Sequence, residues 1–298
     1  MEEEKRLYVR GLMFAILGTI VLSFDALLIR LSGASGIRVV FYRALFTFIS
    51  ITTLFFITKR RKAFAILSSG GFPMIISGVM WGLSGIGFTL GVQTAGAANT
   101  LVLIALSPLF AAAFSGIVYR IRPSLSTIIA TCVSIFGIWF MYREGFGDLD
   151  PKALAFALSA PLFLGSNLSF MRNHKEMARI PLVMIGGLTG SLIALIVSKG
   201  NLRIPVESIL PLGILGFAVI PFAQTMISTG TRYISAPEAA LINSSETVIG
   251  IFYVWLFFGE TPTRDFLLGA SIVILAITAN SIHQAKARKT PPTTTVFS

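Results

Sequence analysis

The amino-acid sequence predicts an all-α polytopic membrane protein, in which ten transmembrane helices form two inverted five-helix repeats. Apolar residues make up 54% of the 298 residues, charged residues make up 12%, and the mean hydropathy is +0.82. This charged fraction is about half that of an ordinary soluble domain, and so few charges cannot cover the outside of a fold in water. The apolar runs are continuous and do not alternate with polar residues, which favours helices over the strands of a membrane barrel.

Ten apolar segments have the length that a membrane helix requires. About 20 apolar residues are needed for a helix to cross about 30 Å of hydrocarbon. Ten such segments leave only short connections, so no separate soluble domain is expected. In chain order, the predicted spans are Gly11 to Ile29, Arg38 to Thr58, Phe72 to Gln93, Ala97 to Tyr119, Ser124 to Tyr142, Pro151 to Met171, Ile180 to Ser198, Ile209 to Thr229, Ala236 to Phe258 and Asp265 to His283.

The basic residues predict how the chain is oriented in the membrane. With the N-terminus inside, 16 of the 24 Lys and Arg residues fall in cytoplasmic connections or tails, seven fall outside and Arg43 falls within a span. The opening Met1 to Arg6 is a poor secretory leader and no small-residue cleavage motif follows it, so the first span is expected to be retained. Both termini are therefore expected on the cytoplasmic side of the cell inner (plasma) membrane.

The sequence excludes several kinds of site. Cys132 is the single cysteine, which excludes a disulfide framework and a zinc site built from thiolates. The net charge of +11 would suggest nucleic acid in a soluble protein, whereas in a membrane protein it indicates basic cytoplasmic loops that face anionic lipid. We therefore expect no metal site and no nucleic-acid partner, and the chain leaves open whether it is a monomer or a dimer.

An enzyme is also not expected. Gly33-Ala34-Ser35-Gly36 and Gly82-Leu83-Ser84-Gly85 both match the G-x-S-G pattern around an intramembrane serine nucleophile. Such a nucleophile needs a base at the same depth. The only two histidines, His174 and His283, fall at cytoplasmic helix ends among basic residues. The sequence also has no phosphate-binding loop and no paired-carboxylate site.

Five spans in each half make the second half begin on the opposite side of the membrane, as in an inverted repeat. At an offset of 138 residues, Ser107 to Phe110 aligns with Ser245 to Val248, and Arg122 aligns with Glu260. The alternative is a chance agreement between two apolar helices. The expected modules are residues 1–145, with spans one to five, and residues 146–298, with spans six to ten and a short basic cytoplasmic tail.

Several stretches together resemble a known family. They are Tyr42 to Leu45, Gln93 to Ala98 and Leu106 to Phe110 in the first half, and Tyr233 to Leu241 and Trp255 to Pro262 in the second. This combination resembles the EamA-type module of the drug/metabolite transporter superfamily. The resemblance covers essentially the whole chain and implies two five-helix modules that transport small metabolites such as amino acids, nucleotide-related compounds or toxic end products. It implies neither a cofactor nor an ATPase.

Asp25 and Arg43 are ionisable residues inside the predicted spans, where each costs about 2.5–3.5 kcal/mol on insertion scales. Asp25 lies four residues before Ile29, about 6 Å from the outer end of its helix, and Arg43 lies five residues after Arg38, about 7.5 Å from the same side. Equal depth on consecutive antiparallel helices predicts an intramembrane ion pair. The pair is either a structural clamp between the first two spans or an outward-facing charge that contacts substrate.

Glu246 lies ten residues after Ala236, about 15 Å into its helix and hence at the midplane of the bilayer. Asn243, Thr247 and Gly250 share its helix face at spacings of three and four residues. No basic residue is expected at that depth, so Glu246 is either protonated or faces a wet cavity. It is the candidate for proton coupling, against the alternative of a tolerated structural group.

Other polar or aromatic side chains fall in spans that line the cavity in the family, and they complete the candidate substrate-binding set. For each of them, helix packing is the alternative. Proline residues at three mid-span positions could act as gate hinges or merely bend their helices. The additional binding candidates are Trp81, Gln93, Asn99, Ser107, Asn167 and Gln224, with Asn243 and Glu246, and the three prolines are Pro108, Pro161 and Pro221.

These observations predict a secondary transporter that works by alternating access. The expected substrate is a small amphipathic metabolite, an amino acid or a related solute, which is exported by facilitated diffusion or in exchange for protons. The transporter alternative is uptake or exchange of a nucleotide-like metabolite such as S-adenosylmethionine or a nucleoside. The alternative of another class is a membrane-complex subunit that has no transport activity of its own. The expected partners are therefore a small-molecule substrate, the lipid bilayer and, in the coupled case, protons.

Overall fold

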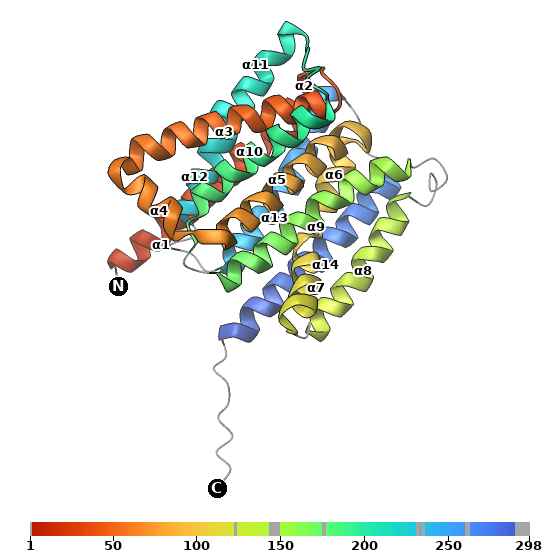
Figure 1. Ribbon diagram of the computed structural model, residues 1–298. Helices are drawn as coiled ribbons and strands as arrows, with labels where there is room; N and C mark the ends of the chain where they lie inside the picture. The colour runs from red at the N-terminus through yellow and green to blue at the C-terminus, as the bar shows by residue number, and fades with distance from the viewer. Residues whose placement is uncertain are drawn as a thin grey trace.

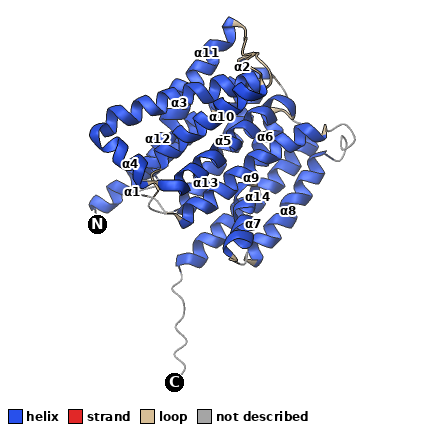
Figure 2. Cartoon of the chain, viewed as in Figure 1, coloured by secondary structure: helices blue, strands red, loops and turns tan. Residues whose placement is uncertain are grey.

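The computed structural model describes residues 2–121, 124–142, 150–174, 177–230, 233, 236–259 and 263–289. Arg122 and Glu260, which align in the expected repeat, lie outside these ranges. The described residues form helices and connecting turns, with no strand among them (Figure 2). In order, the elements are α1 Glu2–Leu22, α2 Phe24–Leu31, α3 Ile37–Lys59, η1 Arg60–Lys62, α4 Ala63–Ser69, α5 Gly71–Thr94, α6 Ala97–Ile104, α7 Ser107–Tyr119, α8 Leu125–Tyr142, α9 Pro151–Asn173, α10 Arg179–Val197, α11 Val206–Ile214, η2 Leu215–Val219, α12 Ile220–Gly230, α13 Ala236–Phe258 and α14 Arg264–Lys289.

Each of the ten predicted spans coincides with one helix or with consecutive helices. Among the described residues, six helical stretches are long and apolar enough to cross a membrane, and the α6–α7 pair, bent by 43°, makes a seventh if it counts as one span. An all-helical polytopic membrane protein is therefore confirmed, while the number of ten spans stays a prediction. The six stretches are Arg6–Leu31, Ile37–Ser69, Gly71–Thr94, Pro151–Met171, Arg179–Val197 and Val206–Ile227.

Helices from the two halves of the chain pack against each other throughout the molecule (Figure 1). The most extensive pairs are α5 with α9, α3 with α10, α8 with α14, α5 with α10 and α1 with α12. Glycine makes this packing close, as in other membrane helices. A Cβ atom added to Gly82 would lie 2.6 Å from the carbonyl oxygen of Gly186, and one added to Gly187 would lie 2.9 Å from that of Ala44. Backbones of α3, α5 and α10 therefore touch directly.

Three of the predicted spans are irregular near their middle. The first is interrupted at Ser23, whose hydroxyl donates to the carbonyl oxygen of Thr19 at 2.8 Å. The fourth breaks between α6 and α7, and Pro108 stands in the first turn of α7, where its missing N–H costs little. In the eighth, the π-helix η2 precedes Pro221 in the first turn of α12. By contrast, α9 continues through Pro161.

The irregular eighth span is held by a hydrogen bond from α3. Pro221 has no N–H to donate to the carbonyl of Phe217, four residues earlier in the chain. The Ser50 hydroxyl donates to that carbonyl oxygen at 3.3 Å. Alongside, a Cβ on Gly216 would clash with the Cβ of Phe46, and the ring centres of Phe46 and Phe217 lie 5.0 Å apart. A side chain of α3 thus replaces the backbone donor that proline removes, as membrane helices require.

Ser50→Ala should therefore lower the thermal stability of the purified protein, because it removes the hydrogen bond that α3 donates to the Phe217 carbonyl. The expected loss is about 0.6 kcal/mol, the average for measured hydrogen bonds between membrane helices, and at most about 1.7 kcal/mol. In a Pro221→Ala background the restored N–H can reach the Phe217 carbonyl, so the same serine change should cost less there. Equal losses in both backgrounds, measured by thermal unfolding in detergent, would contradict this account of the hydrogen bond.

Candidate functional site

A buried ion pair links α2 to α3. Arg43 Nε donates to Asp25 Oδ1 at 3.0 Å, and Arg43 Nη2 donates to Asp25 Oδ2, so the contact is bidentate. Both residues are almost fully buried, with 4% of Asp25 and 7% of Arg43 exposed. A planar guanidinium matches a carboxylate in this geometry, which lowers the cost of burying both charges. The sequence predicts these two residues as partners, and the structure brings them into contact.

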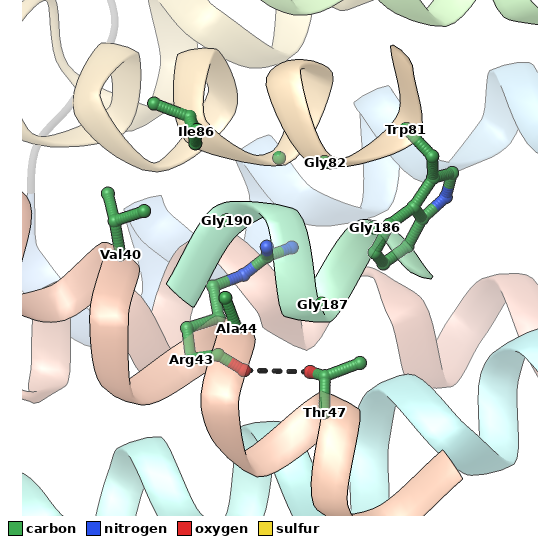
Figure 3. Close-up of a pocket in the computed structure, with 11 residues that line it drawn as sticks. Val40, Arg43, Ala44, Thr47, Trp81, Gly82, Ile86, Gly186, Gly187 and Gly190 are labelled. Carbon is green, nitrogen blue, oxygen red and sulfur yellow. Dashed lines mark hydrogen bonds between the residues drawn. The ribbon is translucent and has the colours of Figure 1, made fainter. Parts of the chain in front are cut away.

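The rest of the Arg43 side chain faces a narrow pocket (Figure 3). The pocket has a volume of about 10 Å³, which is space for about one water molecule. A Cβ atom on Gly85 would lie 3.1 Å from Arg43 Nη1, and the guanidinium carbon lies 5.9 Å from the centre of the Phe88 ring. The lining residues come from α3, α5 and α10, and they are Val40, Arg43, Ala44, Thr47, Trp81, Gly82, Gly85, Ile86, Gly186, Gly187 and Gly190.

Helix α13 is fixed beside α2 and α6. The Thr247 hydroxyl donates to the carbonyl oxygen of Leu101 at 3.2 Å, and a Cβ on Gly250 would lie 2.9 Å from a methyl group of Leu101. One turn further, the ring of Tyr253 stacks on that of Phe24, with 4.4 Å between the ring centres. These contacts hold the face of α13 that carries Glu246 against the helix of Asp25.

Glu246 is half-buried on α13, and its carboxyl interacts electrostatically with both Asp25 and Arg43. The expectation that no basic residue lies at its depth is therefore wrong. The reason is that the distance along one helix gives depth but does not identify the neighbouring helices. The structure thus gathers two acidic groups and one basic group, from α2, α3 and α13, into a cluster that we call the charged cluster (Asp25, Arg43 and Glu246). When all three are ionised, its net charge is −1.

Most of the remaining candidates make structural hydrogen bonds. Gln93 ties α5 to the turn before α3, accepting from the backbone N–H of Gly36 at 2.8 Å and donating to the carbonyl oxygen of Ala34 at 3.2 Å. Asn167, on α9, accepts from the Ser77 hydroxyl of α5 at 2.5 Å. These contacts favour packing roles for Gln93 and Asn167, the alternative that the sequence leaves open.

Two candidates bond a backbone carbonyl of the segment just before their own helix, and the others differ in position. The Asn99 amide donates to the carbonyl oxygen of Ala95 at 2.6 Å, and the Ser107 hydroxyl donates to that of Ile104. Trp81 lines the pocket beside Arg43, while Gln224 is half-buried on α12. The backbone of Asn243 belongs to α13, but its side chain lies outside the described part of the structure.

Sequence reasoning missed the groups that surround Arg43. The Phe88 ring beside its guanidinium gives no signal in a sequence of 25 Phe residues. Gly186 and Gly190 of α10 do form a small-xxx-small pair, which could have pointed to a close helix contact. Within the described residues, no three His, Cys, Asp or Glu side chains are grouped so that they could hold a metal ion.

Comparisons with known proteins add an independent line of information. A family model described as the EamA-like transporter family matches residues 9–143 and 151–282. The chain is 24% identical over 195 residues to an uncharacterized transporter, YdfC, of Bacillus subtilis (strain 168), a match that spans 62% of this chain and 62% of that relative. A crystal structure of a protein superposes with a TM-score of 0.64 at 12% identity over 93% of this chain and 98% of that one, which shows a shared fold.

Proposed function

Because the chain belongs to the EamA-like transporter family, as its sequence motifs indicate, we propose that it is a secondary transporter that exports a small amphipathic metabolite across the plasma membrane by alternating access. The observation that carries this proposal is the charged cluster. It joins α2 and α3 of the first half to α13 of the second, at a position where buried charges are costly. An ionisable group at such a junction is expected to contact the substrate or a coupling ion.

An amino acid is the substrate class that fits the cluster best. Its ammonium group can pair with Glu246, and its carboxylate can pair with Arg43 after that side chain releases Asp25. The net charge of −1 favours one cation at a time, either a proton on Glu246 or the substrate ammonium. A nucleoside carries no ammonium group for this position, so it fits less well, whereas S-adenosylmethionine carries the same ammonium and carboxylate groups as an amino acid.

The packing of the helices supports two inverted modules, residues 1–145 and 146–298. A two-fold axis between the modules would replace each predicted span by the span five positions later, with span six returning to span one. Under this exchange the α5–α9 contact, between spans three and six, becomes the α12–α1 contact, between spans eight and one. The same exchange maps the α3–α10 and α8–α14 pairs onto themselves. This is the pattern of a two-fold axis between repeats. The broken α6–α7 pair and η2 provide discontinuities of the type on which alternating-access transporters are built.

Counterflow in liposomes tests the proposed function. Purified protein is reconstituted with a high internal concentration of one unlabelled amino acid, and uptake of the labelled compound is followed. Saturable uptake of zwitterionic amino acids, inhibited by other members of the class, is the expected result. If neither amino acids nor nucleosides enter faster than they enter protein-free liposomes, the result would favour the subunit alternative. If only nucleosides are transported, the proposed substrate class would be overturned.

Cysteine accessibility tests the proposed orientation. In a Cys132→Ser background, Arg61→Cys should resist an impermeant thiol reagent in intact cells, because the α3–α4 turn is cytoplasmic. Asn201→Cys, which follows the C-terminal end of α10 and is expected on the opposite side of the membrane, should react readily. Both positions are exposed in the structure, so burial does not explain a difference between them. Labelling of Arg61→Cys from outside would reverse the orientation and remove the argument from basic residues.

A further inference from the structure

A basic turn lies at the end of α3, beyond the charged cluster. Lys59, the three residues of η1 and the start of α4 reverse the chain there (Figure 1). Lys59, Arg60, Arg61 and Lys62 are all exposed, and within the described part of the chain none of the four forms an ion pair. We refer to these four residues as the basic turn.

The basic turn begins where the lipid-facing surface ends. Ile57 is 64% exposed in the last turn of α3, only two residues before Lys59, and α3 is apolar enough to cross a membrane. The positive charges therefore begin at the level of the lipid headgroups. Long basic side chains at this level extend along the interface and place their charged ends among phosphates.

Aromatic side chains flank the charges. Phe64 in α4 is 72% exposed and Phe72 in α5 is 71% exposed. The Phe64 ring also packs edge-on against Phe56, with 5.4 Å between ring centres, which fixes α4 against the end of α3. Basic residues next to exposed aromatic rings are the composition of segments that lie in a membrane interface, with the rings in the acyl boundary and the charges at the phosphates.

Arg60 occupies a backbone conformation that favours glycine. Its φ of 43° and ψ of −124° let the chain reverse directly after α3. A side chain at positive φ costs conformational free energy. This conformation folds η1 and α4 back along the end of α3, so that successive basic side chains are exposed around one tight turn.

We propose that the basic turn, with Phe64 and Phe72, is a binding site for the headgroups of anionic phospholipids. Four exposed charges in four consecutive residues complement phosphate diesters, and the chain places them at headgroup depth. A zwitterionic headgroup offers no net charge and gains less. Because α3 also carries Arg43, bound lipid would fix the end of the helix that positions the charged cluster. The inference rests on the membrane position of α3 and stands apart from the transported substrate.

Lipid titration of the full-length purified protein in detergent tests this site. Phosphatidylglycerol should bind in native mass spectra and raise the melting temperature, whereas phosphatidylcholine should do so much less. Changing Lys59, Arg60, Arg61 and Lys62 together to Gln should weaken phosphatidylglycerol binding by about tenfold or more. The matched control is the double variant Lys199→Gln and Arg203→Gln, which removes exposed charges next to α10 at the opposite end of α3 and should keep the preference.

Two further measurements keep the proposal testable if the fourfold variant does not fold. In the wild-type protein, raising NaCl from about 0.15 M to about 0.5 M should weaken phosphatidylglycerol binding, because salt screens exposed charges. The double variant Arg60→Lys and Arg61→Lys keeps the charge and should bind as the wild type does. Equal binding of the two lipids, or a control variant that loses the preference as fully as the fourfold variant, would overturn the proposal.

Discussion

Glu246→Gln should reduce transport at least tenfold while leaving the protein folded and inserted. Gln keeps the size and hydrogen bonding of the side chain but cannot exchange a proton or pair with an ammonium group. The remaining Asp25–Arg43 pair is neutral, so the cluster loses the charge that favours a cation. If Glu246 couples protons, transport by the wild type varies with pH and the variant loses that dependence. If it binds an ammonium group, the variant has weaker substrate affinity and keeps any pH dependence from other groups.

Glu207→Gln is the matched control for this experiment, since it removes an exposed carboxylate at the start of α11. It should transport as the wild type does. The readouts are initial rates in liposomes at several pH values, together with the melting temperature of each protein. Substrate affinity, maximal rate and pH profile that are all unchanged in Glu246→Gln would show that this carboxyl takes no part in transport.

Breaking the Asp25–Arg43 pair should produce the largest losses of stability. Removing one partner of a buried ion pair typically costs about 3–5 kcal/mol, because the other charge stays buried without compensation. The variants Asp25→Asn and Arg43→Gln should lose different amounts of stability. Asp25→Asn leaves Arg43 with Glu246 as an anion that acts on it, whereas Arg43→Gln leaves the two interacting carboxyl groups of Asp25 and Glu246 without the charge of Arg43. We therefore expect Arg43→Gln to be the more destabilising change.

The double variant Asp25→Asn and Arg43→Gln should recover part of the stability that Arg43→Gln loses. Thermal unfolding of the four proteins forms a double-mutant cycle, in which coupling between contacting residues is expected. Strictly additive losses would exclude a structural clamp and favour separate contacts to substrate. If the double variant is stable but inactive, the same pair serves both packing and transport.

The positions of the helices could be predicted from hydropathy alone, but their irregularities could not. The predicted span Ile180 to Ser198 differs from α10 by one residue at each end. Nothing in the apolar pattern predicts η2, because a π-helix has the same composition as an α-helix. Pro161 and Pro221 also both fall in the middle of an apolar segment, yet only Pro221 comes directly after a π-helical stretch. Such changes depend on which neighbour is available to bond the freed carbonyl, and that is set by packing.

The candidate site was predictable only in part for a related reason. Asp25 and Arg43 lie on consecutive helices, so counting residues from their common end was enough to pair them. Glu246 lies more than 200 residues away in the chain from both, and its helix is placed beside them by Phe24, Leu101 and Tyr253. Those contacts involve common apolar residues that carry no signature. Depth along a helix is readable in a sequence, whereas the identity of the adjacent helix is not.

The pairing of helices across the two halves has a consequence for biogenesis. When the first five spans have left the ribosome, α5 and α3 still lack α9 and α10, their principal neighbours. The surfaces of Gly82 and Ala44 that touch α10 must then face lipid or an insertase until the second half is made. The chain is therefore expected to reach its folded state late in synthesis, and a fragment that ends after α8 would insert without the packing that α9 and α10 provide. Quality-control proteases would meet the protein mainly in this half-made form, so folding yield in the cell should depend on how fast translation continues past α8.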